Sequence, residues 1–472
     1  MKSQKMTKKT KWLSCLNPPS RNVQRKPLWL VCIFFLVFFP FLSQAEVSSL
    51  SYTPGDRYAQ VVALQHQAEI GDVSAMLQLA HLYAQGNTLV SRDDAQAAKW
   101  FALAAAKGDA GAQLAIGMRY AQGLGVAKNF QKAVGFYQAG ADQKNAMAEF
   151  LLGQAYDQGM GLVQNHKEAA RWYMLAANQG VRKAQYDLAN LYQTGQGINQ
   201  SVDQAIKWYS KAATLGDANA AFNLAWIYEL GQGVSKNPKK AVTWFSMAAQ
   251  LGDPQAQLIM GDRYAQGNGV TQNDVQAAQY YQQAANQGLP MAEYRLGLAY
   301  LKGRGVSADP KQAYAWLLKA AQQQAQAQYE LGVMFAQGQV VPQDFAKAAR
   351  WYLSAANQGL ASAQLNLGYL YQTGRGVPID HQAAANWFYQ AAMQGNPEAQ
   401  RNLAICYAKG IGVVHDPERA YAWYILAMKG GVEVNQDLAM LRASMSLDQV
   451  QEGEMMATSY GEQIVSTSSK GS

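Results

Sequence analysis

The sequence predicts an all-α solenoid of about ten helix-turn-helix repeats of 36 residues, with capping helices at its ends. Three observations predict this fold. A unit of this length recurs ten times between Gly71 and Gly430, each unit holds two apolar segments of helical spacing, and turn and helix-capping residues separate the segments. A small residue recurs in register at Ala75, Ala112, Ala148, Ala184, Ala220, Ala256, Ala292, Ala327, Ala363 and Ala399. Only two steps differ from 36 residues: 37 into the second unit and 35 into the eighth.

The first segment of each unit has the pattern A-x-x-x-L-(G/A)-x-x-Y, which places its apolar residues on one helix face. Two glycines follow it in eight units, as at Gly195 and Gly197. Glycine adopts the left-handed conformation of a helix C-cap without a steric cost, so we expect the first helix to end there. The first unit (Gly86, Leu89 region) and the eighth (Gly338, Val340) lack the pair, and their turns should differ.

The second segment begins after a residue whose side chain can accept hydrogen bonds from first-turn amides. These N-cap residues are Asp93, Asn129, Asn165, Ser201, Asn237, Asn273, Asp309, Asp344, Asp380 and Asp416. One aromatic position then recurs as Trp100, Phe136, Trp172, Trp208, Trp244, Tyr280, Trp316, Trp351, Trp387 and Trp423. Because it repeats in every unit, we interpret this row as core packing and not as a ligand site.

These motifs, A-x-x-x-L-G-x-x-Y-x-x-G-x-G-V followed by D/N-x-x-x-A-x-x-W-x-x-x-A-A-x-x-G, resemble the Sel-1-like repeats, which are related to tetratricopeptide repeats. The resemblance covers residues 71–430. It implies a right-handed superhelix with a concave face and a role as an adaptor or scaffold in membrane-associated or secretory settings. Some bacterial relatives take part in host-cell entry or envelope maintenance. A cysteine-rich branch is credited with β-lactamase or penicillin-binding activity, but this chain lacks its paired cysteines.

Residues 1–45 have the pattern of a secretory signal peptide. Eight basic residues and no acidic ones occur before residue 27, residues 28–42 are almost wholly apolar, and Ser43-Gln44-Ala45 suits signal-peptidase cleavage. We therefore expect an exported protein, periplasmic or secreted. The alternative is an uncleaved inner-membrane anchor at residues 28–42, although that run is short for a spanning helix. Membrane contact is expected only through such an uncleaved segment.

Removing the leader changes the charge and the cysteine content. The whole chain has a net charge of +8 from 40 basic and 32 acidic residues, and removal of eight basic residues leaves 32 against 32. The basic character thus belongs to the leader, and binding of nucleic acid is not expected. Cys15 and Cys32 lie in the leader, so Cys406 remains alone and should be a buried, unreactive thiol.

The two ends of a repeat array need capping segments with a polar outer face. We expect a linker and capping helix at residues 46–70, C-terminal capping helices at residues 431–465, and a disordered tail at residues 466–472. Ser446 and Gln449 form a capping-box pattern at the start of a final helix to about Tyr460.

The sequence contains no motif for catalysis, a metal or a cofactor. Its histidines, at positions 66, 81, 166, 381 and 415, lack metal-ligand spacing, and no H-E-x-x-H, C-x-x-C, G-x-S-x-G or phosphate-loop pattern occurs. The G-x-G triplets follow helices and not strands, which favours turns over nucleotide binding.

The variable face of the first helices is therefore the candidate partner surface. Its residues, on the side away from the core leucine and tyrosine, are Asp187, Asn190, Asn223, Trp226, Asp262, Arg295, Glu330, Asn366, Tyr369 and Asn402. Trp226 could anchor a partner within a polar rim, or it could pack against a neighbouring helix. The asparagines could hold an extended peptide through its backbone amides, or they could be solvated surface.

The sequence thus favours a non-catalytic scaffold that binds one or more envelope or host proteins. Two alternatives stay open. One is a cell-envelope hydrolase acting on β-lactams or peptidoglycan precursors, and the other is a structural spacer that binds nothing tightly.

Overall fold

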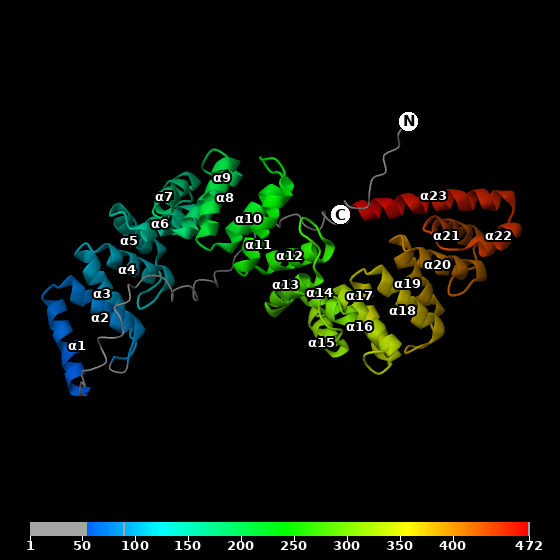
Figure 1. The fold of residues 1–472 in the computed structure, drawn as a ribbon, viewed down its shortest axis with the longest axis horizontal. Helices are drawn as coiled ribbons and strands as arrows, with labels where there is room; N and C mark the ends of the chain where they lie inside the picture. Colours follow the sequence, from blue (N-terminus) through cyan, green and yellow to red (C-terminus); the bar gives the residue numbers. More distant parts are fainter. Residues whose placement is uncertain (1–53, 88–89, 471–472) are drawn as a thin grey trace. The chain divides into compact units, whose positions relative to one another are not determined.

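The computed structural model describes residues 54–87 and 90–470, and all regular secondary structure in these ranges is α-helical. The described helices form two compact units, which we call the N-terminal unit (α1–α12) and the C-terminal unit (α13–α23). Within each unit, consecutive helices pack on one another in chain order (Figure 1). The predicted all-α solenoid is confirmed.

Each repeat contributes two helices, with an even number for the first and an odd number for the second. In the N-terminal unit the helices are α1 (Pro54–Glu69), α2 (Val73–Gln85), α3 (Asp94–Ala106), α4 (Ala110–Gln122), α5 (Phe130–Asp142), α6 (Ala146–Gln158), α7 (His166–Asn178), α8 (Arg182–Thr194), α9 (Val202–Thr214), α10 (Ala218–Leu230), α11 (Pro238–Gln250) and α12 (Pro254–Gln266). In the C-terminal unit they are α13 (Asp274–Asn286), α14 (Pro290–Lys302), α15 (Pro310–Ala320), α16 (Ala325–Gln337), α17 (Phe345–Asn357), α18 (Ala361–Thr373), α19 (His381–Met393), α20 (Pro397–Lys409), α21 (Pro417–Lys429), α22 (Asn435–Ala443) and α23 (Leu447–Lys470).

Side-chain caps start the second helices where the sequence predicts them. The predicted N-cap residues that accept hydrogen bonds from first-turn amides include Asp93, Asn129, Asn165, Ser201, Asn237, Asp309, Asp344, Asp380 and Asp416. The first glycine of each pair ends the first helix in the left-handed conformation, as Gly195 does at the end of α8 (φ 75°). In the eighth repeat Gly338 is left-handed as well, although Val340 replaces the second glycine.

The second glycine has a role that differs from capping. Its φ is positive too, and in six of the eight pairs its Cα lies against the backbone at the start of the second helix one repeat earlier, whereas Gly233 and Gly269 lie against valine side chains. A Cβ at Gly125 would overlap the Asp94 carbonyl of α3, and a Cβ at Gly197 would overlap the His166 carbonyl of α7. The loop thus joins neighbouring repeats by a backbone contact that only glycine permits.

Two adjacent aromatic rows fill the core, and the predicted row is the shallower one. Trp208 is buried, but Trp244, Trp316 and Trp387 are only half-buried. The rings of the predicted row pack against the preceding repeat, as Trp172 does against the hydrophobic cluster around Tyr137. The deeper row is one residue on: Phe101, Tyr137, Tyr173, Tyr209, Phe245, Tyr281, Leu317, Tyr352, Phe388 and Tyr424.

The deeper row packs within its own hairpin against the small residue that follows the core leucine of the first helix. A Cβ at Gly153 would collide with the Tyr173 ring, and one at Gly368 would collide with the Phe388 ring. The motif L-(G/A)-x-x-Y therefore pairs a small residue on one helix with a large ring on the next.

A row of buried glutamines clips three successive helices together, and the sequence reading did not find it. Gln113 of α4 donates through Nε2 to the Ala105 carbonyl at the end of α3 (3.5 Å). Its Oε1 accepts a hydrogen bond of 2.9 Å from Gln143, the C-cap of α5. The donation to the preceding helix recurs at Gln185, Gln257, Gln328, Gln364 and Gln400.

Three first helices of the N-terminal unit lack this glutamine: α2 has Met76, α6 has Glu149 and α10 has Ala221 at the position. Ala221 replaces the glutamine on α10, and Leu215 replaces the C-cap glutamine of α9, so Gln185 Oε1 has no hydrogen bond within the described residues. In the third repeat the buried Glu149 takes the glutamine position and accepts from Gln179 Nε2 (2.7 Å). A carboxylate cannot donate to the carbonyl of the preceding helix as a glutamine does.

Helices cap both described ends of the array. The predicted capping box is confirmed: Ser446 N donates to Gln449 Oε1 (2.9 Å) and Gln449 N donates to Ser446 Oγ (3.2 Å). Helix α23 packs along α21, with Tyr460 stacked on Trp423 at 4.6 Å between ring centroids. It continues to Lys470, so the tail predicted to be disordered from residue 466 is helical up to that point. Ile464 packs on the last repeats, which extends the helix beyond Tyr460.

The predicted leader and anchor, with Cys15 and Cys32, lie outside the described residues. Among the helices that the structure describes, none combines the length and the apolar character needed to cross a membrane. Cys406 is buried as predicted, and burial raises the pKa of its thiol to about 11, which disfavours the reactive thiolate.

Replacing Gly197 with alanine tests the backbone contact between repeats. Gly197→Ala should lower the free energy of unfolding by about 2 kcal/mol more than Gly180→Ala does, as measured in urea. Both glycines have positive φ, but a Cβ at Gly180 would meet no atom within 4 Å. Equal losses in the two variants would show that only the dihedral angle matters.

Two single substitutions, Glu149→Gln and Gln113→Glu, test the contribution of the glutamine clip to stability. Glu149→Gln should stabilise the protein by about 1 kcal/mol at pH 7, because the amide gains a donor for the preceding helix. Burial raises the pKa of Glu149, so the folded wild type binds its proton more tightly than the unfolded chain. Wild-type stability from this group therefore rises as the pH falls towards about 4.3, and the advantage of the variant should shrink. Gln113→Glu should show the opposite effect, and a pH-independent difference in either variant would contradict the assignment.

Candidate functional site

The predicted partner surface consists of first-helix side chains that point away from the core leucine. In the N-terminal unit it includes Asp187 and Asn190 on α8, Asn223 and Trp226 on α10, and Asp262 on α12. In the C-terminal unit it includes Arg295 on α14, Glu330 on α16, Asn366 and Tyr369 on α18, and Asn402 on α20. All but Tyr369 are half-buried or buried. The surface is therefore built into the array and does not project from it.

In the N-terminal unit, buried tyrosines hold the predicted asparagines in place. The Tyr209 hydroxyl, on a side chain that is 0% exposed, lies 2.5 Å from Asn190 Oδ1 and 2.7 Å from Gln193 Oε1. Its single proton can be donated to either acceptor. The Asn223 side chain also acts on Tyr209 and Tyr186, where it opposes the rise in pKa that burial causes, and this connects α8, α9 and α10. We call Tyr186, Asp187, Asn190, Tyr209 and Asn223 the α8–α10 cluster.

The negative charge of Asp187 acts on Tyr186 and Tyr209, and also on Tyr173. Burial raises the pKa of Tyr173 well above its ordinary value, and the negative charge of Asp187 raises it further. Burial is also the main reason why the pKa of Tyr186 is raised, with a smaller contribution from Asp187. These hydroxyls thus stay protonated and act as hydrogen-bond donors across the neutral pH range.

Trp226 is not an exposed anchor, because the structure places it in the interior at 8% exposure. Its ring lies edge-on to Phe245 (centroids 5.4 Å, 89°) and to Phe222 (6.2 Å, 76°). Trp226 thus packs against a neighbouring helix, which is the second of the two alternatives for this residue. His81 against Phe101 and Tyr369 against Phe388 have the same edge-on geometry at the same repeat positions. The three repeats that have a ring at the Trp226 position of the first helix are thus the three repeats that have a phenylalanine in the deeper aromatic row of the second helix.

In the C-terminal unit, the predicted residues again associate with tyrosines. Asn366 acts on Tyr329 and Tyr352, where it opposes the rise in pKa that burial causes, and Asn402 donates through Nδ2 to the Tyr369 hydroxyl (2.7 Å). Asn402 is only 8% exposed, whereas Tyr369 is 36% exposed. Asn402 therefore fixes the orientation of the one predicted residue that is open to solvent. We call Tyr329, Glu330, Asn366, Tyr369 and Asn402 the α16–α20 cluster.

The structure brings some of the predicted residues together and separates others. Asp187, Asn190 and Asn223 belong to one network, and Glu330 joins Asn366 through Tyr329. Asp262 and Arg295 are half-buried and lie in different units. The sequence reading missed Tyr186, Tyr209 and Tyr329. Comparing which repeats carry tyrosine in place of phenylalanine or leucine at these positions would have identified them.

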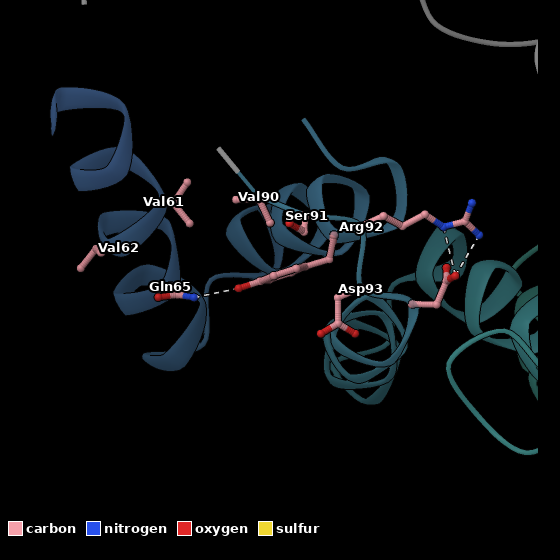
Figure 2. Close-up of a pocket in the computed structure, with 9 residues that line it drawn as sticks. Val61, Val62, Gln65, Val90, Ser91, Arg92 and Asp93 are labelled. Atoms are coloured by element: carbon pink, nitrogen blue, oxygen red, sulfur yellow. Dashed lines mark hydrogen bonds and ion pairs between the residues drawn. The ribbon is translucent and has the colours of Figure 1, made fainter. Parts of the chain in front are cut away.

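Neither of two cavities in the described part of the chain coincides with these clusters. One, of about 630 Å³, lies between α1 and the loop of the first repeat and is lined by Val61, Gln65, Val90, Arg92 and Asp94 among others (Figure 2). Gln65 Nε2 donates to the Tyr83 hydroxyl there (3.0 Å), and Arg92 pairs with Asp94 (2.8 Å). This is one of the two repeats whose loops lack the second glycine.

The second cavity, of about 360 Å³, lies beside the C-terminal cap. Its lining includes Tyr389, Tyr407, Arg419 and Tyr460. Arg419 is ion-paired with Asp416 (3.2 Å) and hydrogen-bonded to Tyr407, which raises the pKa of the guanidinium further. Among the described residues, no three histidine, cysteine, aspartate or glutamate side chains group closely enough to hold a metal ion.

Comparisons with known proteins identify the repeat. The Sel1 repeat model matches ten times, at residues 73–109, 110–145, 146–181, 182–217, 218–253, 254–289, 290–324, 325–360, 361–396 and 397–440. Among curated proteins, no match was found.

Two solved structures show the same architecture. A protective antigen present in uropathogenic Escherichia coli strains, displaying an SLR fold, is 29% identical, with a TM-score of 0.68 over 86% of this chain and 95% of that chain. A Sel1 repeat protein from Oxalobacter formigenes is 36% identical, with a TM-score of 0.51 over 65% of this chain and 90% of that chain. Because the repeat matches extend from residue 73 to residue 440, this chain belongs to the Sel1 repeat family.

Proposed function

We propose that this protein is a non-catalytic scaffold that holds other proteins on the first-helix faces of its two units. Sel1 repeat proteins are generally protein-interaction scaffolds, and this supports the general class of function. The observation that carries the proposal is the α8–α10 cluster, in which the Tyr209 hydroxyl hydrogen-bonds to Asn190 and the Asn223 side chain acts on both Tyr186 and Tyr209. The α16–α20 cluster repeats this arrangement in the other unit.

Rigid polar groups favour recognition because less side-chain entropy is lost when a partner binds. An asparagine held by a buried tyrosine keeps one orientation before and after binding. Its remaining donor or acceptor is then available to an extended segment, whose backbone offers both kinds of group. Side chains on rigid helices also keep their spacing from one repeat to the next, so a partner with a matching spacing is preferred.

We further propose that the scaffold acts outside the cytoplasm, in the periplasm or as a secreted protein. The basic start of the chain, the apolar run at residues 28–42 and the Ser43-Gln44-Ala45 site support this placement. The similarity to a protective antigen of uropathogenic Escherichia coli fits an exported protein. Partners of this class would be envelope proteins or host proteins.

Site-specific photo-crosslinking in the producer cell tests the scaffold proposal. Thr194 and Thr373 are exposed and lie one helical turn beyond Asn190 and Tyr369, so a crosslinking amino acid there should capture a defined protein. Lys207 and Arg350, exposed on second helices, are the matched control positions. We expect dominant products from the first pair only, identified by mass spectrometry. Equal yields from all four positions, or no product from a folded protein, would contradict the proposal.

The N-terminus of the protein isolated from fractionated cells tests the placement. We expect the sequence to begin at Glu46 and the protein to occur in the periplasmic or external fraction. An intact leader in the membrane fraction would establish the anchor instead. An intact leader in the cytoplasm would refute export.

A further inference from the structure

The cavity beside the C-terminal cap is enclosed by four helices of the C-terminal unit. Ala385 and Tyr389 come from α19, Leu403 from α20, Arg419 from α21 and Tyr460 from α23. Ala385 and Leu403 are each 1% exposed and form its inner end, whereas Tyr389 is 45% exposed and stands at its opening. Its volume of about 360 Å³ lies in the range of pockets that hold small organic ligands.

Two of the tyrosine rings that line this cavity are fixed by the same tryptophan. Trp423, which is 1% exposed, stacks on Tyr460 at 4.6 Å between ring centroids and lies edge-on to Tyr389 at 6.2 Å. The third ring, Tyr407, packs against the core of the last repeats. Within the described residues, no hydrogen bond engages the hydroxyls of Tyr389 and Tyr460. The cavity thus offers fixed ring surfaces together with hydroxyl groups that are open to a ligand.

Arg419 brings a positive charge to the opening, and two contacts fix its position. Its Nε lies 3.2 Å from Asp416 Oδ2, and its Cζ lies 5.6 Å from the centroid of the Tyr407 ring. Asp416 is itself held as the N-cap of α21, because its Oδ1 accepts a hydrogen bond from the Arg419 amide (2.8 Å). A guanidinium has five N–H donors, so the contacts with Asp416 and Tyr407 leave further donors for a ligand.

These groups favour a ligand that combines an aromatic ring with a carboxylate. The guanidinium repels a cation, and its planar donors match a carboxylate. Asp416 already offsets one positive charge, so a singly charged anion fits the site better than a doubly charged phosphate. Burial raises the pKa of Tyr460, so its hydroxyl stays protonated and also donates to an anion. The tyrosine rings and Leu403 provide the surface on which an aromatic ring packs.

We propose that this cavity, which we call the cap cavity, binds an aromatic carboxylate. The ring of the ligand packs between Tyr389 and Tyr460, and its carboxylate accepts hydrogen bonds from Arg419. Such a ligand is either a free acid or the aromatic residue at the carboxyl end of a polypeptide, since both present the same two groups. No lining residue of the cap cavity belongs to the predicted partner surface, so this inference stands independently of the scaffold proposal.

Three related probes test the chemistry of the ligand: hydrocinnamate, its neutral amide, and propanoate, which lacks the ring. Ligand-detected NMR titrations of the full chain give the dissociation constants. We expect hydrocinnamate to bind, the amide to bind about fivefold more weakly, and propanoate to bind no better than the amide. Equal binding of hydrocinnamate and either of the other two probes, or no binding of hydrocinnamate, would overturn the proposal.

Replacing Arg419 tests where the carboxylate lies. Arg419→Gln should weaken hydrocinnamate binding about fivefold and leave binding of the amide nearly unchanged. The matched control is Arg375→Gln, because Arg375 is also exposed and lies 5.5 Å from the centroid of the Phe345 ring but does not line the cap cavity. The control should bind hydrocinnamate as the wild type does. Equal losses in the two variants would contradict the placement at Arg419.

Replacing Tyr389 tests the ring contact with little risk to the fold, because this side chain is 45% exposed. Tyr389→Ala should retain the helical circular dichroism of the wild type and bind hydrocinnamate several-fold more weakly. Wild-type affinity in the folded variant would show that the ligand ring packs elsewhere, and the proposal would be wrong.

A glycine-serine peptide that ends in a free phenylalanine carboxylate distinguishes the two sources of the ligand. Tighter binding than hydrocinnamate, weakened by Arg419→Gln, would assign the cap cavity to the end of a polypeptide. Binding no tighter than hydrocinnamate would assign it to a free acid. Crosslinking from positions 194 and 373 tests the scaffold proposal separately, because neither position lines the cap cavity.

Discussion

The contact on which much of the array depends is the approach of the second loop glycine to the first turn of the second helix one repeat earlier, which six repeats make against backbone atoms. At Gly125, Gly197 and Gly412 no Cβ can be accommodated, so backbone meets backbone across the junction. This contact sets the spacing between repeats. At that spacing, the tryptophan row reaches the preceding repeat and the glutamine clips reach a helix carbonyl. The C-terminal cap uses the same device, because Gly453 of α23 lies against Tyr421 and the Glu418 carbonyl of α21.

Much of the fold could be predicted because its signals are local and repeated. A cap residue such as Asp309 and a C-cap glycine such as Gly195 act on their own helices, and ten copies reinforce each signal. The contacts between repeats were harder to foresee. Gln113 is polar and suggests surface, yet it is buried because its amide has partners on two other helices. Nothing in the spacing of Trp208 indicates that Tyr209, one residue later, lies deeper.

In the candidate site, too, the features set within one helix could be predicted, whereas the contacts between helices could not. Helical register correctly places Asn190, Asn223 and Asn366 on one side of their helices, but it cannot show which of them contacts a tyrosine from the next helix. Trp226 stood out by its identity alone, and its burial follows from Phe245, a residue on another helix. The polar residues therefore have two roles. They satisfy buried hydroxyls, and through the orientation thus imposed they give the surface a fixed pattern of donors and acceptors.

The missing clip at Ala221 and Leu215 has a mechanical consequence. In the repeats that have it, the glutamine amide resists sliding of one repeat past the next, because sliding would break a directional hydrogen bond to the preceding helix. Between α9 and α10 that hydrogen bond is absent, and Ala221 contributes only non-directional apolar packing in its place. The junction between the fourth and fifth repeats should therefore yield to sliding more easily than a junction that a glutamine bridges. That junction lies within the α8–α10 cluster, where Tyr209 and Asn223 face each other across it.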